Sequence, residues 1–200
     1  MSLTDVDWSG LPQPEDDGAA AHLPGLMLPL VSLPSTTGGS VDVGQLAGLS
    51  VLYVYPMTGR PDRALPEGWD MIPGARGCTP QSCAFRDHFD ELRALGVQNL
   101  FGVSTQDTAE QAEAAARLHL PFALLSDAAL ELADALSLPR FEVEGRTLLK
   151  RMTLFVEDRQ IVRVHYPVFP PDADATRVLT WLKARSGSSD TSSGAGTSRP

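Results

Sequence analysis

The pattern of apolar and polar positions divides the middle of the chain into alternating strands and helices. Residues 49–55, LSVLYVY, are rich in β-branched and aromatic residues, which predicts a buried central strand that ends at Pro56. Further strands are predicted over 100–103 and 122–125, and a hairpin over 151–156 and 160–166; helices are predicted over 108–118, 128–136 and 174–184. This alternation predicts an α/β sheet with helices on both faces.

Another helix is predicted directly before residue 96. Phe85, Phe89, Leu92 and Leu95 are spaced by four, three and three positions, which places them on one face of a single helix. Gly96 stands where a helix commonly ends in a left-handed residue. The segment between the central strand and this helix, residues 57–77, is rich in Gly and Pro and long for a loop inside a compact domain.

The two ends differ in composition from residues 25–185, which we take as one domain. Residues 1–24 are rich in Pro, Asp, Gly and Ala and are expected to form a loosely attached arm, which Trp8 and Leu11 could fix to the body. Residues 186–200 are Ser, Gly and Thr with almost nothing to bury, so a disordered tail is expected there.

Composition and charge exclude several function classes. The chain has 200 residues and a formal net charge of −9, which argues against nucleic acid or an anionic membrane surface as the main partner. No segment approaches the roughly 20 apolar residues of a membrane helix, and the start does not read as a secretory signal, so the cytoplasm is expected. Two cysteines are too few for a disulfide scaffold, and the histidines show no metal-ligand spacing with them.

The two cysteines are the strongest candidates for chemistry. Cys78 follows Gly77 at the expected start of a helix, where unpaired backbone N–H groups and the helix dipole favour a thiolate over a thiol. The thiolate is the nucleophilic form of cysteine. Pro80 fits the first helical turn, in which its missing N–H costs nothing.

A bond between Cys78 and Cys83 would require a conformational change. On one intact helix the two residues would lie roughly 140° apart around the axis, with Cα atoms roughly 8–9 Å apart, beyond the ~7 Å limit for a disulfide. The first helical turns would therefore have to unwind. The spacing alone does not distinguish such a redox pair from two ordinary buried cysteines, because cysteine is among the most buried residue types.

The wider sequence resembles the bacterioferritin comigratory protein, or Q, branch of the peroxiredoxins, over roughly residues 24–183. The segments that carry the resemblance are Tyr55-Pro56, Gly77-Cys78-Thr79, Cys83-Ala84-Phe85-Arg86-Asp87, Phe101 to Asp107 (FGVSTQD), Leu124-Leu125-Ser126-Asp127 and Arg151 to Val156 (RMTLFV). They stand in the family's order, and together they are quite specific.

The resemblance implies a thioredoxin-like fold with a central mixed sheet, and reduction of hydroperoxides without metal, flavin or other cofactor. It implies that Cys78 is the peroxidatic cysteine, that Cys83 is the resolving cysteine of an intrachain disulfide, and that Arg151 reaches the active site. Pro56, Gly77 and Thr79 fall on the active-site loop. The resemblance also implies thioredoxin or a similar dithiol as reductant, and it favours a monomer.

One departure from the family pattern affects the loop. The family has a threonine three residues before the peroxidatic cysteine, where this chain has Ala75, and about 15 residues are inserted after Pro56. We therefore expect Thr58 to supply the missing hydroxyl from the front of the loop. The insertion, with Trp69 and Met71, could form a lid or apolar rim, or it could be a neutral surface elaboration.

Other functions stay open at this point. A thioredoxin-like disulfide oxidoreductase would share the fold, but such enzymes use Cys-x-x-Cys, which does not occur here. A redox sensor would use the same cysteine switch without turnover. In a third version Cys83 is structural, and an outside thiol resolves Cys78.

Overall fold

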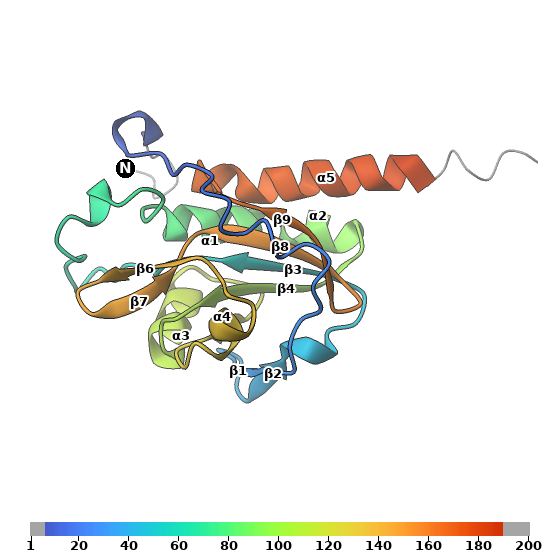
Figure 1. Ribbon diagram of the computed structural model, residues 1–200, viewed down its shortest axis with the longest axis horizontal. Coiled ribbons are helices and arrows are strands. Elements are labelled where there is room, and N and C mark those ends of the chain that lie inside the picture. The colour runs from blue at the N-terminus through green and yellow to red at the C-terminus, as the bar shows by residue number, and fades with distance from the viewer. Residues whose placement is uncertain (1–6, 190–200) are drawn as a thin grey trace, which may run out of the picture.

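A five-stranded sheet in the order β5-β4-β3-β8-β9 forms the centre of the computed structural model, which describes residues 7–189 (Figure 1). Its strands are β3 (Leu49–Val54), β4 (Val97–Ser104), β5 (Leu124–Ser126), β8 (Met152–Glu157) and β9 (Gln160–His165). β3 and β4 are parallel, as are β4 and β5, whereas β8 is antiparallel to both β3 and β9. The predicted mixed α/β sheet is therefore confirmed.

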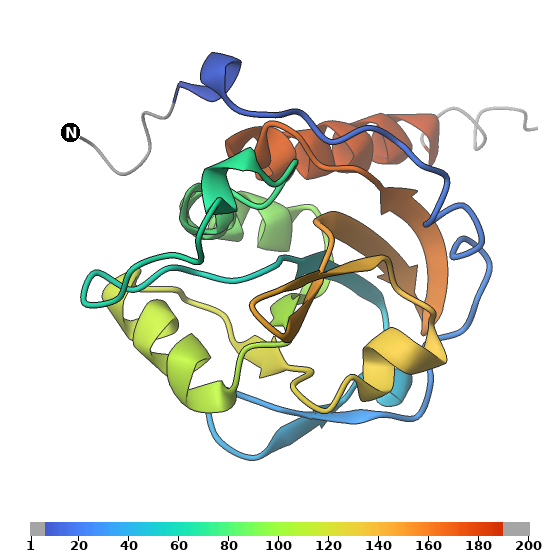
Figure 2. The same ribbon diagram turned by 60° about the vertical axis from the view of Figure 1, so that its left-hand side comes forward.

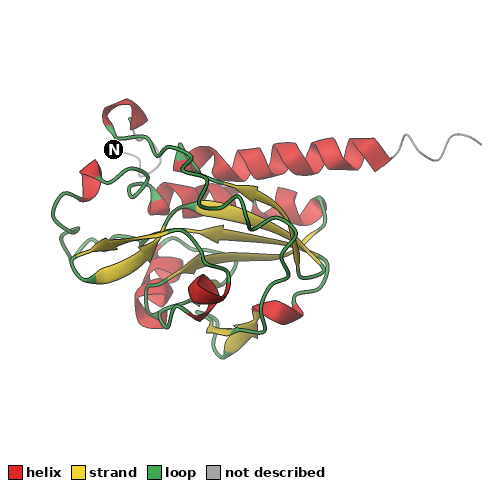
Figure 3. Ribbon diagram, viewed as in Figure 1, coloured by secondary structure: helices red, strands yellow, loops and turns green. Residues whose placement is uncertain are grey.

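Helices cover both faces of this sheet. They are α1 (Cys78–Asp87), α2 (Phe89–Ala94), α3 (Thr108–Arg117), α4 (Glu131–Ala135) and α5 (Asp174–Ser189). In Figure 3, α1, α2 and α5 lie above the sheet and α4 lies below it. The side chains of β3 alternate between two apolar cores because successive strand residues point to opposite faces. Val51 and Tyr53 join the core under α1 and α5, and Leu52 and Val54 join the opposite core.

The predicted single helix before residue 96 is two helices, separated at His88. The backbone of His88 departs from helical geometry, with φ −102° and ψ 8°. Its N–H donates to the carbonyl of Ala84, and its own carbonyl accepts from the N–H of Leu92, so the chain changes direction without losing hydrogen bonds. The predicted apolar face survives, because Phe85 and Leu92 are buried in the same core.

Two small hairpins flank the sheet. β1 (Ser32–Pro34) and β2 (Ser40–Asp42) pair antiparallel around a turn, and the 3₁₀ turn η2 (Val43–Gln45) follows them. The second hairpin, β6 (Arg140–Val143) with β7 (Arg146–Leu149), was absent from the sequence prediction. Leu148 of β7 is buried against Met57, Trp69 and Ala75, so this hairpin supports the long loop that leads to Cys78.

The N-terminal arm is attached more firmly than its composition predicts. Leu23 is completely buried in the main core, and Asp17 accepts hydrogen bonds from Lys150 and Tyr166. Trp8, in the 3₁₀ turn η1 (Trp8–Gly10), donates to Asp172 and meets Phe169 edge to face, so it holds the arm against the segment before α5. Figure 2 shows the arm, in blue, running alongside α5, in red.

At the other end α5 continues to Ser189, beyond the predicted helix end at residue 184. Residues 1–6 and 190–200, which include most of the expected tail, lie outside the described residues. No helix within residues 7–189 is both long enough and apolar enough to cross a membrane.

Candidate active site

Cys78 is the first residue of α1, with Gly77 as its N-cap. Gly77 has a φ of 104°, a conformation that residues with a side chain rarely adopt. A Cβ at this position would also lie only 2.5 Å from Pro171 and 2.8 Å from Trp8. The close approach of the 3₁₀ turn η4 (Pro171–Ala173) and of the arm therefore requires glycine directly before the cysteine, whose side chain is 3% exposed.

Arg151 lies between β7 and β8 and brings a buried positive charge to Cys78. Its Nη2 donates to the sulfur of Cys78 across 3.1 Å. The same nitrogen lies 3.1–3.2 Å from the carbonyl oxygens of Gly74, Ala75 and Arg76. The guanidinium thus lies against the sulfur of Cys78 and also fixes the end of the loop that leads to it.

A buried polar network orients this guanidinium. Nη1 of Arg151 donates to Oε1 of Gln81, and Nε2 of Gln81 donates to Oδ2 of Asp174 across 2.7 Å. The hydroxyl of Thr153 donates to the same carboxylate oxygen across 2.6 Å. The network ties α1, β8 and the start of α5 together behind Cys78. Neither Asp174 nor Gln81 is predicted from the sequence as part of the site; the available signal is the position of Gln81, three residues after Cys78.

Cys83 lies on the same helix, and both cysteines are free thiols. Burial raises the pKa of the Cys83 thiol above its ordinary value, although the nearby Arg86 partly offsets this effect. Cys83 is therefore protonated at neutral pH. Because α1 is an intact helix from residue 78 to residue 87, its geometry keeps the two sulfurs from bonding in this conformation.

A cavity of about 730 Å³ opens onto Cys78. Its walls come from the long loop (Met57, Gly59, Arg60, Pro61, Arg63, Leu65, Trp69), from the segment Ala75–Pro80 that contains Cys78 and Thr79, from the arm (Asp7, Trp8) and from Arg117. The inserted loop is therefore part of the site. The volume exceeds many times the ~30 Å³ that one water molecule occupies in the liquid.

Known proteins are similar to this chain in sequence and in fold. The family model described as Redoxin matches residues 23–179. A Mycobacterium tuberculosis protein named as a peroxiredoxin is 32% identical over 162 residues, which cover 78% of this chain and 93% of that protein. The chain is a peroxiredoxin of the redoxin family. Several of its relatives and structural neighbours are named peroxiredoxin Q or bacterioferritin comigratory protein, which supports the Q branch.

Two further comparisons concern length and fold. Chloroplastic peroxiredoxin Q from wheat (Triticum aestivum) is 29% identical over 143 residues, covering 71% of this chain; the chain spans only 58% of that protein. The crystal structure of peroxidoxin BcpB from Mycobacterium tuberculosis superposes with a TM-score of 0.65 at 27% identity, covering 80% of this chain and 96% of that one. Peroxiredoxin Q of Xanthomonas campestris, with a TM-score of 0.60 at 23% identity, shares the fold.

Pro56 and Thr58, at the start of the long loop of this peroxiredoxin, have different surroundings. Pro56 lines a second cavity, of about 460 Å³, together with Arg151 and residues 13–15 and 17 of the arm. The hydroxyl of Thr58 is buried and donates to Oε1 of Gln106 across 3.1 Å, and the backbone N–H of Thr58 donates to the same oxygen. The structure thus brings Cys78 and Arg151 into contact, whereas Thr58 is not among the residues that line the Cys78 cavity and its hydroxyl is bonded to Gln106.

Within residues 7–189, no three His, Cys, Asp or Glu side chains come together as a group that could hold a metal ion.

Proposed function

We propose that this peroxiredoxin is a thiol peroxidase that reduces hydrogen peroxide and organic hydroperoxides. The observation that carries the proposal is the contact between Cys78 and Arg151: a nucleophile at a helix start, with a buried guanidinium nitrogen 3.1 Å from its sulfur. A positive charge fixed there favours the thiolate before reaction. It also stabilises negative charge on the peroxide oxygens as the O–O bond breaks.

In the first step the Cys78 thiolate attacks one peroxide oxygen. A sulfur–oxygen bond forms and the O–O bond breaks; the leaving oxygen takes the hydroperoxide proton and departs as water or an alcohol. Cys78 is left as a sulfenate, oxidised by two electrons, and the peroxide is reduced by two. Donors already aimed at the reacting oxygens lower the barrier without reorganising.

In the second step Cys83 resolves the sulfenic acid. Unwinding of the first turns of α1 would let the sulfur of Cys83 reach that of Cys78, forming an intrachain disulfide and releasing water. Thioredoxin or a similar dithiol would then reduce the disulfide by exchange, returning two electrons. We propose that the protein does this as a monomer in the cytoplasm; the wheat relative is named as a chloroplastic protein, so this location is a proposal for the present chain alone.

A coupled turnover assay tests this function. Reduced wild-type protein should consume hydrogen peroxide over many cycles when a thioredoxin system supplies electrons, and Cys78→Ser should consume none above the rate without protein. Cys83→Ser, which also removes one thiol but keeps Cys78, is the matched control. If the wild type is oxidised once and then accumulates in its oxidised form without turnover, the result favours the redox-sensor alternative instead.

We further propose that Thr58 takes the place of the family threonine. It is buried between Met57 and Gly59, both of which line the Cys78 cavity. Thr58→Val keeps the shape but loses the hydroxyl, so the rate constant for oxidation of Cys78 should fall about 10²-fold, the low end of the loss for one donor to a developing charge. Stopped-flow measurement with hydrogen peroxide checks this, with Thr58→Ser as the conservative control. If Thr58→Val reacts at the wild-type rate, the proposal is wrong, and the hydroxyl serves only to bond Gln106.

A further inference from the structure

Two buried polar atoms behind the active site face each other without a hydrogen-bond partner among residues 7–189. They are Nδ1 of His165, the last residue of β9, and Oδ1 of Asp174, the first residue of α5, and they lie 3.9 Å apart. The side chain of Asp174 is completely buried, and that of His165 is 16% exposed. Buried polar atoms in folded proteins almost always have a partner, so each of these two atoms is the natural partner of the other.

Cross-strand pairing turns the ring of His165 toward α5. His165 stands opposite Thr153 in the antiparallel pair of β9 and β8, so the two side chains lie on the same face of the sheet. The hydroxyl of Thr153 donates to Oδ2 of Asp174 across 2.6 Å. The ring of His165 also meets Phe155 edge to face, with the ring centroids 4.6 Å apart, which fixes the plane of the imidazole.

A hydrogen on Nδ1 of His165 would give both atoms a partner at once. An ionised carboxylate only accepts hydrogen bonds, so Oδ1 of Asp174 needs a donor. The imidazole carries a hydrogen on Nδ1 in one of its two neutral tautomers and in its charged form. The separation exceeds an ordinary N–H···O hydrogen bond by roughly 0.7–1 Å, which a small rotation of either side chain supplies.

The carboxylate of Asp174 decides which way the amide of Gln81 faces. Because the carboxylate only accepts, Gln81 donates to it from Nε2, across 2.7 Å, and its Oε1 is left to accept from Nη1 of Arg151. With the amide reversed, two donors would face each other at Arg151. A donor on Oδ1 of Asp174 would hold the carboxylate in the rotation that presents Oδ2 to Gln81. The chain of contacts then runs from His165 to Arg151, whose Nη2 lies 3.1 Å from the reacting sulfur.

We propose that His165 is a positioning residue for the oxidation of Cys78, and that it acts by donating from Nδ1 to Oδ1 of Asp174. Its effect passes through Asp174 and Gln81 to Arg151, and it has no contact of its own with the peroxide. The neutral Nδ1–H tautomer and the charged ring make the same hydrogen bond, so the role does not depend on titration of His165. This inference rests on the proposed peroxidase function and adds a residue to the network that orients Arg151.

Nitrogen-15 NMR of the imidazole at pH 8 tests the position of the hydrogen without any measurement of activity. The chain has four histidines, and the signals of His165 are those that disappear in His165→Phe. In the reduced wild type, Nδ1 of His165 should carry a hydrogen and couple to it. A ring that carries its hydrogen on Nε2 alone would overturn the inference, because Nδ1 would then present a lone pair to the carboxylate.

Two substitutions at His165 give opposite results for a donor and for packing. His165→Phe keeps an aromatic ring against Phe155 but loses the donor, so the rate constant for oxidation of Cys78 by hydrogen peroxide should fall about 5-fold, the size of one hydrogen bond. His165→Asn loses the ring but keeps an amide N–H close to the position of Nδ1, so it should stay within about two-fold of the wild type. Stopped-flow oxidation measures both. A fast His165→Phe and a slow His165→Asn would show that the ring only packs, and would overturn the inference.

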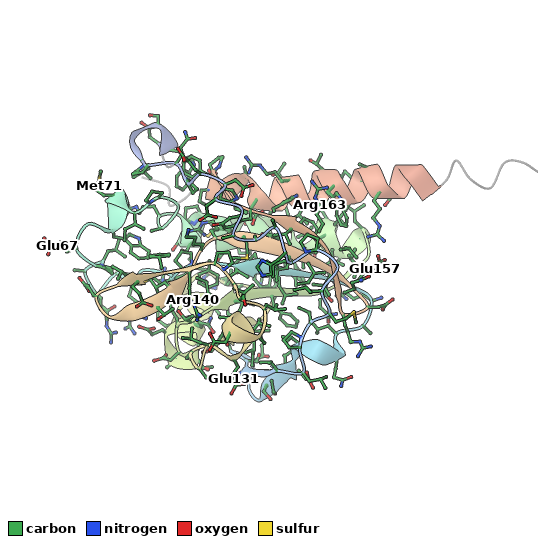
Figure 4. All side chains as sticks on the ribbon, viewed as in Figure 1. Glu67, Met71, Glu131, Arg140, Glu157 and Arg163 are labelled. Atoms are coloured by element: carbon green, nitrogen blue, oxygen red, sulfur yellow. The ribbon has the colours of Figure 1, made fainter. Side chains whose placement is uncertain are left out.

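A control variant and a double variant test the route. Arg163, labelled in Figure 4, is exposed and stands two residues before His165 on β9, so Arg163→Gln should react at the wild-type rate. In an Asp174→Asn background, adding His165→Phe should change the rate by less than about two-fold, because the route through Asp174 is already broken. A full loss in that background would overturn the route. Near-UV circular dichroism identifies the variants that are folded and can be compared.

The outcomes separate this inference from the function on which it rests. A wild type that reacts with hydrogen peroxide no faster than a free thiol would refute the peroxidase proposal, and the role of His165 with it. A wild type that reacts fast, together with a His165→Phe variant that reacts equally fast, would refute only the positioning role.

Discussion

Replacing Arg151 with methionine is expected to slow the oxidation of Cys78 by hydrogen peroxide by about 10²–10³-fold, the usual loss when a donor to a developing charge is removed. The Nη2 of Arg151 lies 3.1 Å from the sulfur, and the residue is only 3% exposed, so water cannot replace it without rearrangement. Methionine keeps much of the length of the side chain but carries neither charge nor donors. Stopped-flow oxidation at several peroxide concentrations gives the rate constant.

Two further variants separate chemistry from folding in this experiment. Arg151→Lys keeps the charge but loses the planar fork that reaches Cys78 and Gln81 together, so it should recover only part of the rate. Arg163→Met, on the exposed face of β9, should react like the wild type. A folded Arg151→Met protein, judged by near-UV circular dichroism, that keeps the wild-type rate would contradict the assigned role of Arg151.

Replacing Cys83 with serine should separate the two steps of the cycle. The first oxidation of Cys78 should stay close to the wild-type rate, whereas steady-state turnover with a thioredoxin system should fall to less than about one tenth, because no thiol remains to form the intrachain disulfide. Mass spectrometry should then find sulfenic and sulfinic acid at Cys78 instead of a disulfide. Turnover that stays intact in Cys83→Ser would show that an outside thiol resolves Cys78 directly.

The disulfide step should also depend on pH in a defined direction. Burial raises the pKa of Cys83 in the folded helix, and even after α1 unwinds an exposed thiol has an ordinary pKa of ~8.5, so near neutral pH most of the protein carries Cys83 as the unreactive thiol. The rate of disulfide formation in the wild type should therefore rise as the pH increases above 7, until the pKa of Cys83 is passed. This phase should be absent from Cys83→Ser at every pH.

The parts of the fold that sequence reasoning found are those with a strong local pattern. The apolar run before Pro56 is β3, and the two alternating runs after residue 150 are the β8–β9 hairpin. Cys78 and Gly77 were recognisable as a helix start because glycine and the first-turn proline mark it locally. The resemblance added Arg151, which no local pattern would have brought to Cys78.

What sequence reasoning missed depends on contacts between distant segments. The hairpin of β6 and β7 has strands of only four residues each, and it is stabilised by the burial of Leu148 under the inserted loop. The bond from Gln81 to Asp174 joins residues 93 positions apart, and neither side chain signals the other. Likewise, the arm looked loosely attached because its contact with Gly77, through Trp8, appears only in the folded chain.

The most direct test of the account is stopped-flow tryptophan fluorescence of the reduced protein mixed with hydrogen peroxide. Trp8 approaches Gly77 and Trp69 lines the Cys78 cavity, so both lie where oxidation and unwinding of α1 would change their surroundings. The account predicts a fast, peroxide-dependent phase that is absent from Cys78→Ser, followed by a slower phase that is absent from Cys83→Ser. Wild-type protein that reacts no faster than a free thiol would contradict it.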